Sequence, residues 1–106
     1  MPNESFVVFS TFPDAETARR IARELVTEKL AACANILPPV ESIYHWQGQL
    51  DQSAEVLVVF KTTAERYAAM EAKLKQLHPY EVPEIIALPI SAGSESYLRW
   101  IEDSCR

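Results

Sequence analysis

The stretch between Val40 and Lys61 is rich in residues that favour β-strands, and Gln47 and Gly48 interrupt it. Pro38 and Pro39 precede it and exclude a helix at its start. We therefore predict a long β-hairpin that turns at Gln47 and Gly48. The two faces of its first arm carry Val40, Ser42, Tyr44 and Trp46 on one side, and Glu41, Ile43 and His45 on the other.

The second arm of this hairpin is apolar on both faces. A strand of that kind needs cover on both sides. We expect helices over one face and consider another subunit as the cover for the other. The alternating residues are Val56, Val58 and Phe60 on one face, and Leu57, Val59 and Lys61 on the other.

The segments around the hairpin predict helices and further strands. Phe6 to Phe12 is a bulky run that favours a buried strand. An amphipathic helix follows, with Asp14 as its N-cap and apolar residues at helical spacing as far as Leu30. Thr62 and Glu65 have the spacing of a capping box at the start of a second helix, which ends before His78.

The last third of the chain adds one strand and one helix. Pro83 precedes an apolar strand from Glu84 to Ile90, and Ser94 is placed to cap a short helix that carries Tyr97. The order is βαββαβ with a terminal helix. We predict an α+β, ferredoxin-like fold with helices on one face of an antiparallel sheet, forming a single domain over residues 1–106.

Composition excludes several classes of function. The only two glycines, Gly48 and Gly93, lie too far apart for a phosphate-binding loop or a nucleophile elbow. Fifteen acidic against ten basic residues give a net charge of -5, which disfavours nucleic acid. The chain shows neither a long apolar run nor a signal sequence, so we expect no membrane partner and a cytoplasmic location.

His78 and Glu84 are candidate metal ligands. Imidazole and carboxylate groups suit zinc or copper, and their spacing would form an open, non-helical chelate. A structural zinc needs about four ligands, so a site here would be weak or would need a second subunit. The alternative is a rigid connector, in which prolines fix the backbone and His78 ends the helix.

Aromatic side chains in the hairpin suggest an interface. Tyr44 and Trp46 lie near the predicted tip, where a chain of 106 residues has little core to cover them. A homo-oligomer would cover them and pair the hairpin edges, and Trp100 could join it; the alternative is that both tryptophans fill the monomer core. Lys61 is either a solvated strand end or a cation that points into a pocket. Cys33 lies in an apolar segment, where a free cysteine is expected to be a small buried side chain.

Four spaced segments carry a further signal: EKLAACANI (28–36), SIYHWQGQL (42–50), EVLVVFKTT (55–63) and HPYEVPEII (78–86). Together they resemble the CutA family of divalent-cation tolerance proteins, and the resemblance extends from about Phe6 to the final helix. It implies a tight homotrimer of ferredoxin-like subunits and tolerance of copper and other divalent metals. It also implies an architecture like that of PII signalling proteins, with crevices between subunits that bind a regulatory ligand.

The resemblance also assigns positions to a copper site. Bacterial members are proposed to use a cysteine in the first strand, a histidine before the HPY motif and the glutamate of the PE pair. Ser10, Leu77 and Glu84 occupy these positions here. Only the glutamate remains, and the thiolate that selects copper is absent.

Three hypotheses follow. The first is a trimeric metal-response protein with weak divalent-cation sites, copper included, at Glu84 and His78 near subunit boundaries. The second is a PII-like sensor that binds a small organic anion in an inter-subunit pocket. An enzyme with His78 or Glu84 as base is the third, and we do not favour it because no nucleophile or cofactor motif is present. The pocket of the second hypothesis would be lined by Cys33, Tyr44, Trp46, Lys61, Tyr80 and Trp100.

Overall fold

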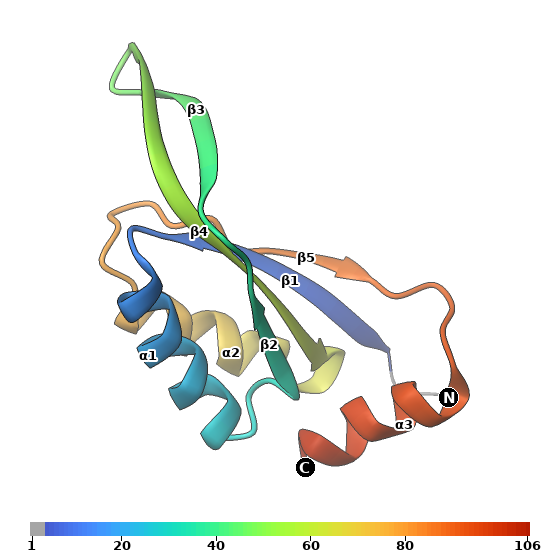
Figure 1. Cartoon of the computed structure of the whole chain (residues 1–106). Helices are drawn as coiled ribbons and strands as arrows, with labels where there is room; N and C mark the ends of the chain where they lie inside the picture. Colours follow the sequence, from blue (N-terminus) through green and yellow to red (C-terminus); the bar gives the residue numbers. More distant parts are fainter. Residues whose placement is uncertain (1–3) are drawn as a thin grey trace.

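The computed structural model describes residues 4–106 and contains a five-stranded sheet with two helices packed on one face (Figure 1). A third helix lies at one end of the sheet, and a hairpin projects from the other end. The strands are β1 (Ser5–Phe12), β2 (Cys33–Ile36), β3 (Val40–Trp46), β4 (Gln49–Thr63) and β5 (Ile86–Pro89). The helices are α1 (Ala15–Thr27), α2 (Ala64–Leu77) and α3 (Glu95–Ser104).

The strand order β2-β4-β1-β5 is the ferredoxin-like order, with β2 and β3 together taking the place of one strand. Every pairing is antiparallel, and β3 pairs with the outer part of β4. The predicted α+β fold is confirmed. The separate strand β2 was not predicted; it ends before Pro38 and Pro39, which lack the N–H needed to continue the ladder.

The predicted hairpin is confirmed, including its turn. Trp46 pairs with Gln49, and the two residues between them have φ values of 50° at Gln47 and 76° at Gly48. Two consecutive positive φ angles are the mark of a type I′ turn, which matches the right-handed twist of the strands.

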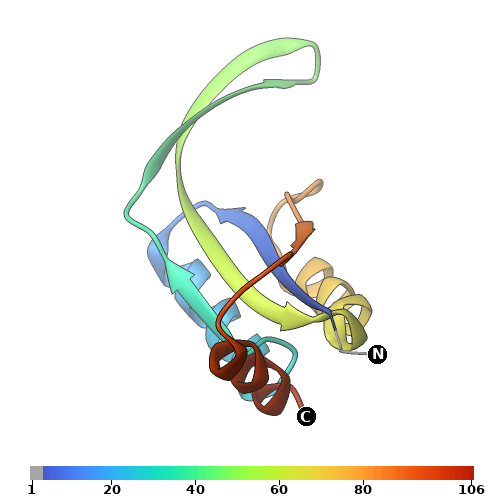
Figure 2. The ribbon, with the colours of Figure 1, turned by 90° about the vertical axis from the view of Figure 1, so that its right-hand side faces the viewer.

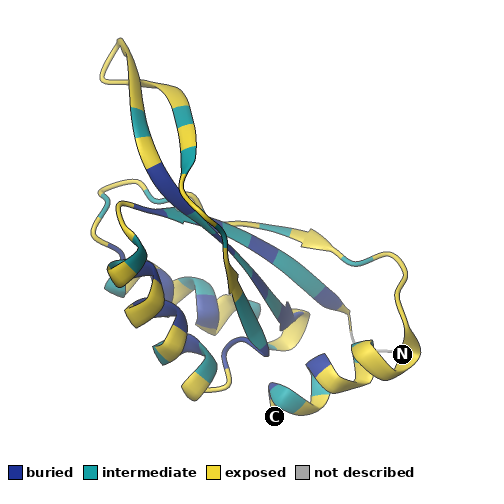
Figure 3. Cartoon of the chain, viewed as in Figure 1, coloured by how far each residue is buried: buried dark blue, intermediate teal, exposed yellow. Residues whose placement is uncertain are grey.

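The core lies between the sheet and the helices α1 and α2. The alternation of β4 places Val56, Val58 and Phe60 on this face, where they are almost fully buried. Figure 3 shows the same pattern, with buried residues at the contact between helices and sheet and exposed ones along the hairpin. The main partners from other elements are Val8, Phe12, Ala18, Ile21, Leu25, Met70 and Leu74.

The opposite face of the sheet is apolar and largely open. Register places Phe9 beside Val59 and Ile86, and Val7 beside Leu88. Ile86 and Leu88 are 52% and 48% exposed. Helix α3 reaches only one end of this face, as the turned view in Figure 2 shows. The predicted cover by helices is therefore found on one face of β4, and the protomer leaves most of the other face uncovered.

Helix boundaries follow the predicted capping in part. The Thr17 N–H donates to Asp14 Oδ1 at 2.7 Å, which confirms Asp14 as the cap of α1. Ser94 stands at the N-cap of α3 but makes no side-chain hydrogen bond to the helix backbone.

The capping box predicted at Thr62 was wrong by one residue. Thr63 is the N-cap of α2 and accepts from the Arg66 N–H at 3.2 Å. Thr62 faces the core and is fully buried, so its hydroxyl donates to the Leu30 carbonyl at 2.7 Å instead. The demand of a buried hydroxyl for a partner outweighed the local sequence pattern.

Two predicted ends were also too long. Helix α1 stops at Thr27 because Lys29 adopts a φ of 61°, and the Leu30 N–H then bonds the Leu25 carbonyl in a Schellman cap. The strand predicted from Glu84 to Ile90 pairs with β1 only over Ile86–Pro89. Because the pairing with β1 begins only at Ile86, Glu84 lies in the connector between α2 and β5.

Candidate functional site

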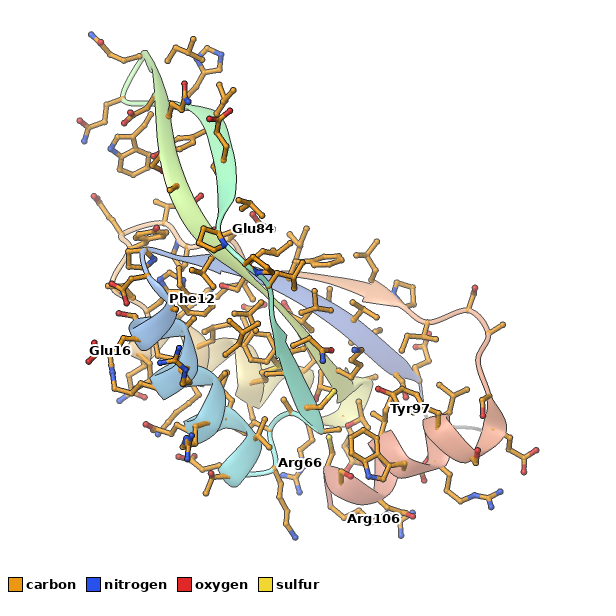
Figure 4. The ribbon with its side chains drawn as sticks, viewed as in Figure 1. Phe12, Glu16, Arg66, Glu84, Tyr97 and Arg106 are labelled. Carbon is orange, nitrogen blue, oxygen red and sulfur yellow. The ribbon has the colours of Figure 1, made fainter. Side chains whose placement is uncertain are left out.

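A cleft of about 1040 Å³ lies between the hairpin and the connector that runs from Pro79 to Glu84. The hairpin contributes Tyr44, Trp46 and Asp51 to its walls, and the connector contributes Tyr80 and Glu84. Figure 4 places Glu84 at the base of the hairpin, well away from Tyr97 at the α3 end. Residues far apart in the sequence thus form one concave site.

His78 anchors the connector to the core. Its ring stacks on Phe12 with centroids 4.6 Å apart, and it lies 4.9 Å from the ring of Tyr80. The Nε2–H donates to the Thr11 carbonyl at 2.9 Å, and Nδ1 accepts from the Tyr80 N–H at 3.2 Å. Burial lowers the pKa of His78, which favours the neutral ring that this pair of bonds requires.

Tyr80 and Glu55 join the connector to the hairpin. The Tyr80 hydroxyl donates to Glu55 Oε2 at 2.7 Å, and Glu55 is only 9% exposed. Burial, helped by this hydrogen bond, raises the pKa of Tyr80 well above its usual value, so the phenol stays protonated and donates. A second bond, of 3.0 Å between the hydroxyls of Tyr44 and Ser53, fixes the aromatic wall of the hairpin.

The structure separates the two predicted metal ligands. Glu84 is exposed and lines the cleft, whereas both ring nitrogens of His78 are engaged in hydrogen bonds within the chain. Over residues 4–106 no group of three or more His, Cys, Asp or Glu side chains comes together in a way that could hold a metal ion. Of the two predicted ligands, one protomer therefore leaves only Glu84 available to a metal ion. The contacts of His78 favour the alternative, in which it holds the rigid connector in place.

The positions that the family resemblance assigned to copper do not assemble either. Ser10 is fully buried on the helix-covered face of β1, and its hydroxyl has no hydrogen-bond partner among the described residues. Leu77 packs against the core. Neither side chain supplies a metal ligand, so Glu84 alone keeps the expected chemistry.

The six predicted pocket residues fall into two groups at opposite ends of the sheet. Tyr44, Trp46 and Tyr80 line the cleft. Cys33, Lys61 and Trp100 belong to the α3 end: Cys33 pairs with Lys61, and its sulfur lies 3.9 Å from the hydroxyl of Tyr97, whose ring neighbours Trp100. A single protomer does not bring all six together.

Sequence reasoning missed Glu55 and Asp51 as residues of the cleft. The register of the hairpin could have found them, because a turn at Gln47 and Gly48 pairs Tyr44 with Asp51 and Val40 with Glu55. The contact between Glu55 and Tyr80 had no such signal, since the two residues lie on segments joined only through the tertiary structure.

Comparison with known proteins places the chain in a family. A model of the family described as "CutA1 divalent ion tolerance protein" matches residues 6–104. The "Divalent-cation tolerance protein CutA" of Thermus thermophilus is 48% identical over 98 residues, which cover 92% of this chain and 95% of that protein. A solved structure of the divalent cation tolerance protein from Thermus thermophilus superposes with a TM-score of 0.92 at 47% identity, covering 94% of this chain and 97% of that one.

A more distant structure agrees. The protein described as periplasmic divalent cation tolerance protein CutA from Archaeoglobus fulgidus is 35% identical, with a TM-score of 0.92 over 96% of this chain and 99% of that chain. The location in that description concerns the Archaeoglobus protein. In this chain, none of the helices within residues 4–106 is long and apolar enough to cross a membrane. The fold, the spaced motifs and these matches together make the chain a member of the CutA1 divalent ion tolerance protein family.

Proposed function

We propose that the chain acts as a homotrimer in the tolerance of divalent cations, copper among them, and that it binds such ions weakly near its subunit boundaries. Its subunits are not enzymes in this proposal, and they work in the cytoplasm. Membership of the family supports the role in tolerance. The open apolar face of the sheet supports the assembly.

The assembly follows from the contrast between the two faces of the sheet. One face is covered by α1 and α2, whereas the other carries the exposed side chains of Ile86 and Leu88 beside Phe9 and Val59, which are only partly buried. A contiguous apolar sheet face of this kind is typical of an interface between subunits. The number three comes from the family resemblance.

Light scattering tests the assembly. The expected mass is three times the 12.0 kDa of one chain. Leu88→Lys should lower the mass to that of a smaller species while circular dichroism stays unchanged, because a charge on this face cannot be buried unpaired. The matched control is Ala69→Lys on the exposed side of α2, away from both the open face of the sheet and the hairpin. A monomeric wild-type chain would contradict the proposal.

Ion binding would use Glu84, with the remaining ligands from a neighbouring chain or from water. A site with so few protein ligands is expected to be weak and exchangeable. Calorimetric titration with copper and zinc should show weak binding that Glu84→Ala reduces and Glu65→Ala, in the first turn of α2, does not. Absence of binding at millimolar copper and zinc would refute this part while leaving the trimer intact.

Tolerance itself is tested in cells. A bacterial strain that lacks its own relative of this family should grow better on toxic copper when it expresses the chain, and Leu88→Lys should lose that effect if the trimer is the active form. Equal growth with and without the chain would contradict the proposed role.

A second candidate is a PII-like sensor of a small organic anion, and the surroundings of Lys61 favour it. The ammonium group donates to the amide oxygen of Asn35 and has no carboxylate partner among residues 4–106. A pocket that joins Lys61, Cys33 and Trp100 to the hairpin aromatics would require two subunits. A thermal-shift screen of nucleotides and carboxylates should give hits that Lys61→Met abolishes; a screen without hits argues against the sensor.

A further inference from the structure

Two hydrogen bonds of the His78 ring, which we call the His78 latch, hold the connector against the core. The ring is 7% exposed and stacks on Phe12 of β1. Its Nε2–H donates to the Thr11 carbonyl, and its Nδ1 accepts from the Tyr80 N–H. Because one nitrogen donates and the other accepts, the two bonds form together only on the neutral ring.

A proton on Nδ1 would break one half of this latch. The protonated ring carries a hydrogen on both nitrogens. Nδ1–H would then face the Tyr80 N–H across 3.2 Å, with two donors and no acceptor between them. The bond to the Thr11 carbonyl needs no change, since Nε2 keeps its hydrogen. Protonation therefore releases the connector and leaves the ring attached to β1.

The groups around the ring set the pH of this change. Burial lowers the pKa of His78, whereas the bond to the Thr11 carbonyl and the negative charge of Glu55 on β4 raise it. From β1, Phe12 brings no charge, and the Tyr80 phenol on the connector stays neutral. The ring also follows the last turn of α2, and the C-terminal end of a helix favours positive charge. Burial acts most strongly, so the ring is neutral at pH 7.5 and takes up its proton in acid.

The connector from Pro79 to Glu84 depends on few other bonds. Among the described residues it makes two hydrogen bonds, and Tyr80 makes both, one through its N–H to His78 and one through its hydroxyl to Glu55. We propose that the His78 latch is a pH-sensitive switch built into the fold. In acid the ring takes up a proton and releases the Tyr80 N–H, and the connector loosens from the core while the sheet and helices stay folded.

Exchange of the Tyr80 amide hydrogen tests the switch. It is measured by NMR on the assembled protein at pH 7.5 and 5.0 and corrected for the intrinsic pH dependence of exchange. Protection of this amide should fall about tenfold in acid, as expected for the loss of one hydrogen bond. The amides of Val56–Thr62 in β4 should keep their protection. Unchanged protection at Tyr80, or an equal loss in β4, would overturn the proposal.

The variant His78→Gln removes the titration and keeps the bonding pattern. Its amide offers one donor and one acceptor and takes up no proton in this range, so protection at Tyr80 should be the same at both pH values. The matched control is His45→Gln on the exposed hairpin, which should respond to acid as wild type does. A loss of protection in His78→Gln as large as in wild type would contradict the switch.

Glu55 is a second group near the latch that could respond to acid. Tyr80→Phe removes the hydroxyl bond to Glu55 and keeps the backbone N–H, so the acid response at position 80 should remain. Its disappearance would assign the response to Glu55 and overturn the proposal.

The ring itself gives a measurement that needs no variant. The ¹⁵N signals of His78 in the wild-type protein should show protonation of Nδ1 over the same pH range in which Tyr80 loses protection, and a mismatch would overturn the switch. Light scattering should give one subunit number at both pH values, since the switch does not depend on assembly. Dissociation in acid would assign the response to an interface between subunits instead.

Discussion

The two halves of strand β4 contrast sharply although they belong to one continuous strand of 15 residues. From Val56 to Thr63 alternate side chains are buried against α1 and α2, whereas from Gln49 to Ala54 nearly every side chain is exposed on the hairpin. Backbone pairing is equally regular in both halves. The difference shows that tertiary cover, and not strand formation, decides which half carries stability and which half is free to build the cleft.

The largest difference in unfolding free energy is expected when one apolar side chain in each half of β4 is replaced by alanine. Phe60→Ala removes a fully buried ring from the inner half and should destabilise the fold by about 3–5 kcal/mol. Leu50→Ala at the hairpin tip should change stability by less than about 0.5 kcal/mol, because that side chain is 72% exposed. Urea unfolding at one fixed protein concentration measures both, and similar losses would erase the contrast.

The pH dependence of stability tests the role of His78, which ties the connector to the core. Burial lowers the pKa of His78, so the unfolded chain takes up a proton more readily than the folded one. Its contribution to stability is complete above the unfolded pKa of about 6.5 and falls as the pH drops below it. Unfolding free energies at pH 7.5 and 5.5 should differ less in His78→Gln than in wild type. In His45→Gln, which alters an exposed hairpin residue, the difference should stay that of wild type.

Serine-to-alanine changes should have opposite signs in the two regions. Ser10 is buried, and its hydroxyl has no partner among the described residues, so Ser10→Ala should stabilise the fold by about 1 kcal/mol. Ser53 bonds the Tyr44 hydroxyl on the hairpin, so Ser53→Ala should be neutral or destabilise by less than about 1 kcal/mol. Thermal unfolding of both variants checks this; a destabilised Ser10→Ala would mean that the hydroxyl has a partner.

The smallest effects concern the two turns with positive φ. Lys29 ends α1 at a φ of 61°, a position that favours glycine, so Lys29→Gly should stabilise the protein by less than about 1 kcal/mol, because the added chain entropy of glycine offsets part of the gain. Gln47→Asn at the hairpin tip should add only a few tenths of a kcal/mol, since this turn opens without unfolding the core. Amide exchange faster at Gln49–Ala54 than at Val56–Thr62 would support the reason given.

Much of the fold could be predicted because local patterns report burial directly. The alternation in β4 put Val56, Val58 and Phe60 together on one face, which the structure shows to be the core face, and the Gln47–Gly48 pair located the turn. Errors arose where long-range contacts override local signals. Thr62 has the spacing of a cap, yet its burial sends its hydroxyl to the Leu30 carbonyl.

The candidate site was predicted only in part. Tyr44, Trp46 and Tyr80 were predicted to line a ligand pocket and Glu84 to bind a metal, and the structure places all four along one cleft. That they bind a ligand or a metal there stays a prediction. Glu55 was missed, since its role depends on a contact with Tyr80 across the fold. Whether Lys61 and Trp100 join the site depends on neighbouring subunits and stays a prediction.

The sequence by itself determined the order of the helices and strands except for the separate strand β2, as well as the hairpin turn and the family of this protein, because each of these depends on residue types at short or fixed spacings. Only the tertiary structure decided which histidine nitrogens are engaged, which carboxylates share the cleft and which face of the sheet stays open. These properties depend on packing between segments distant in the chain, and a buried group takes the partner that the fold provides.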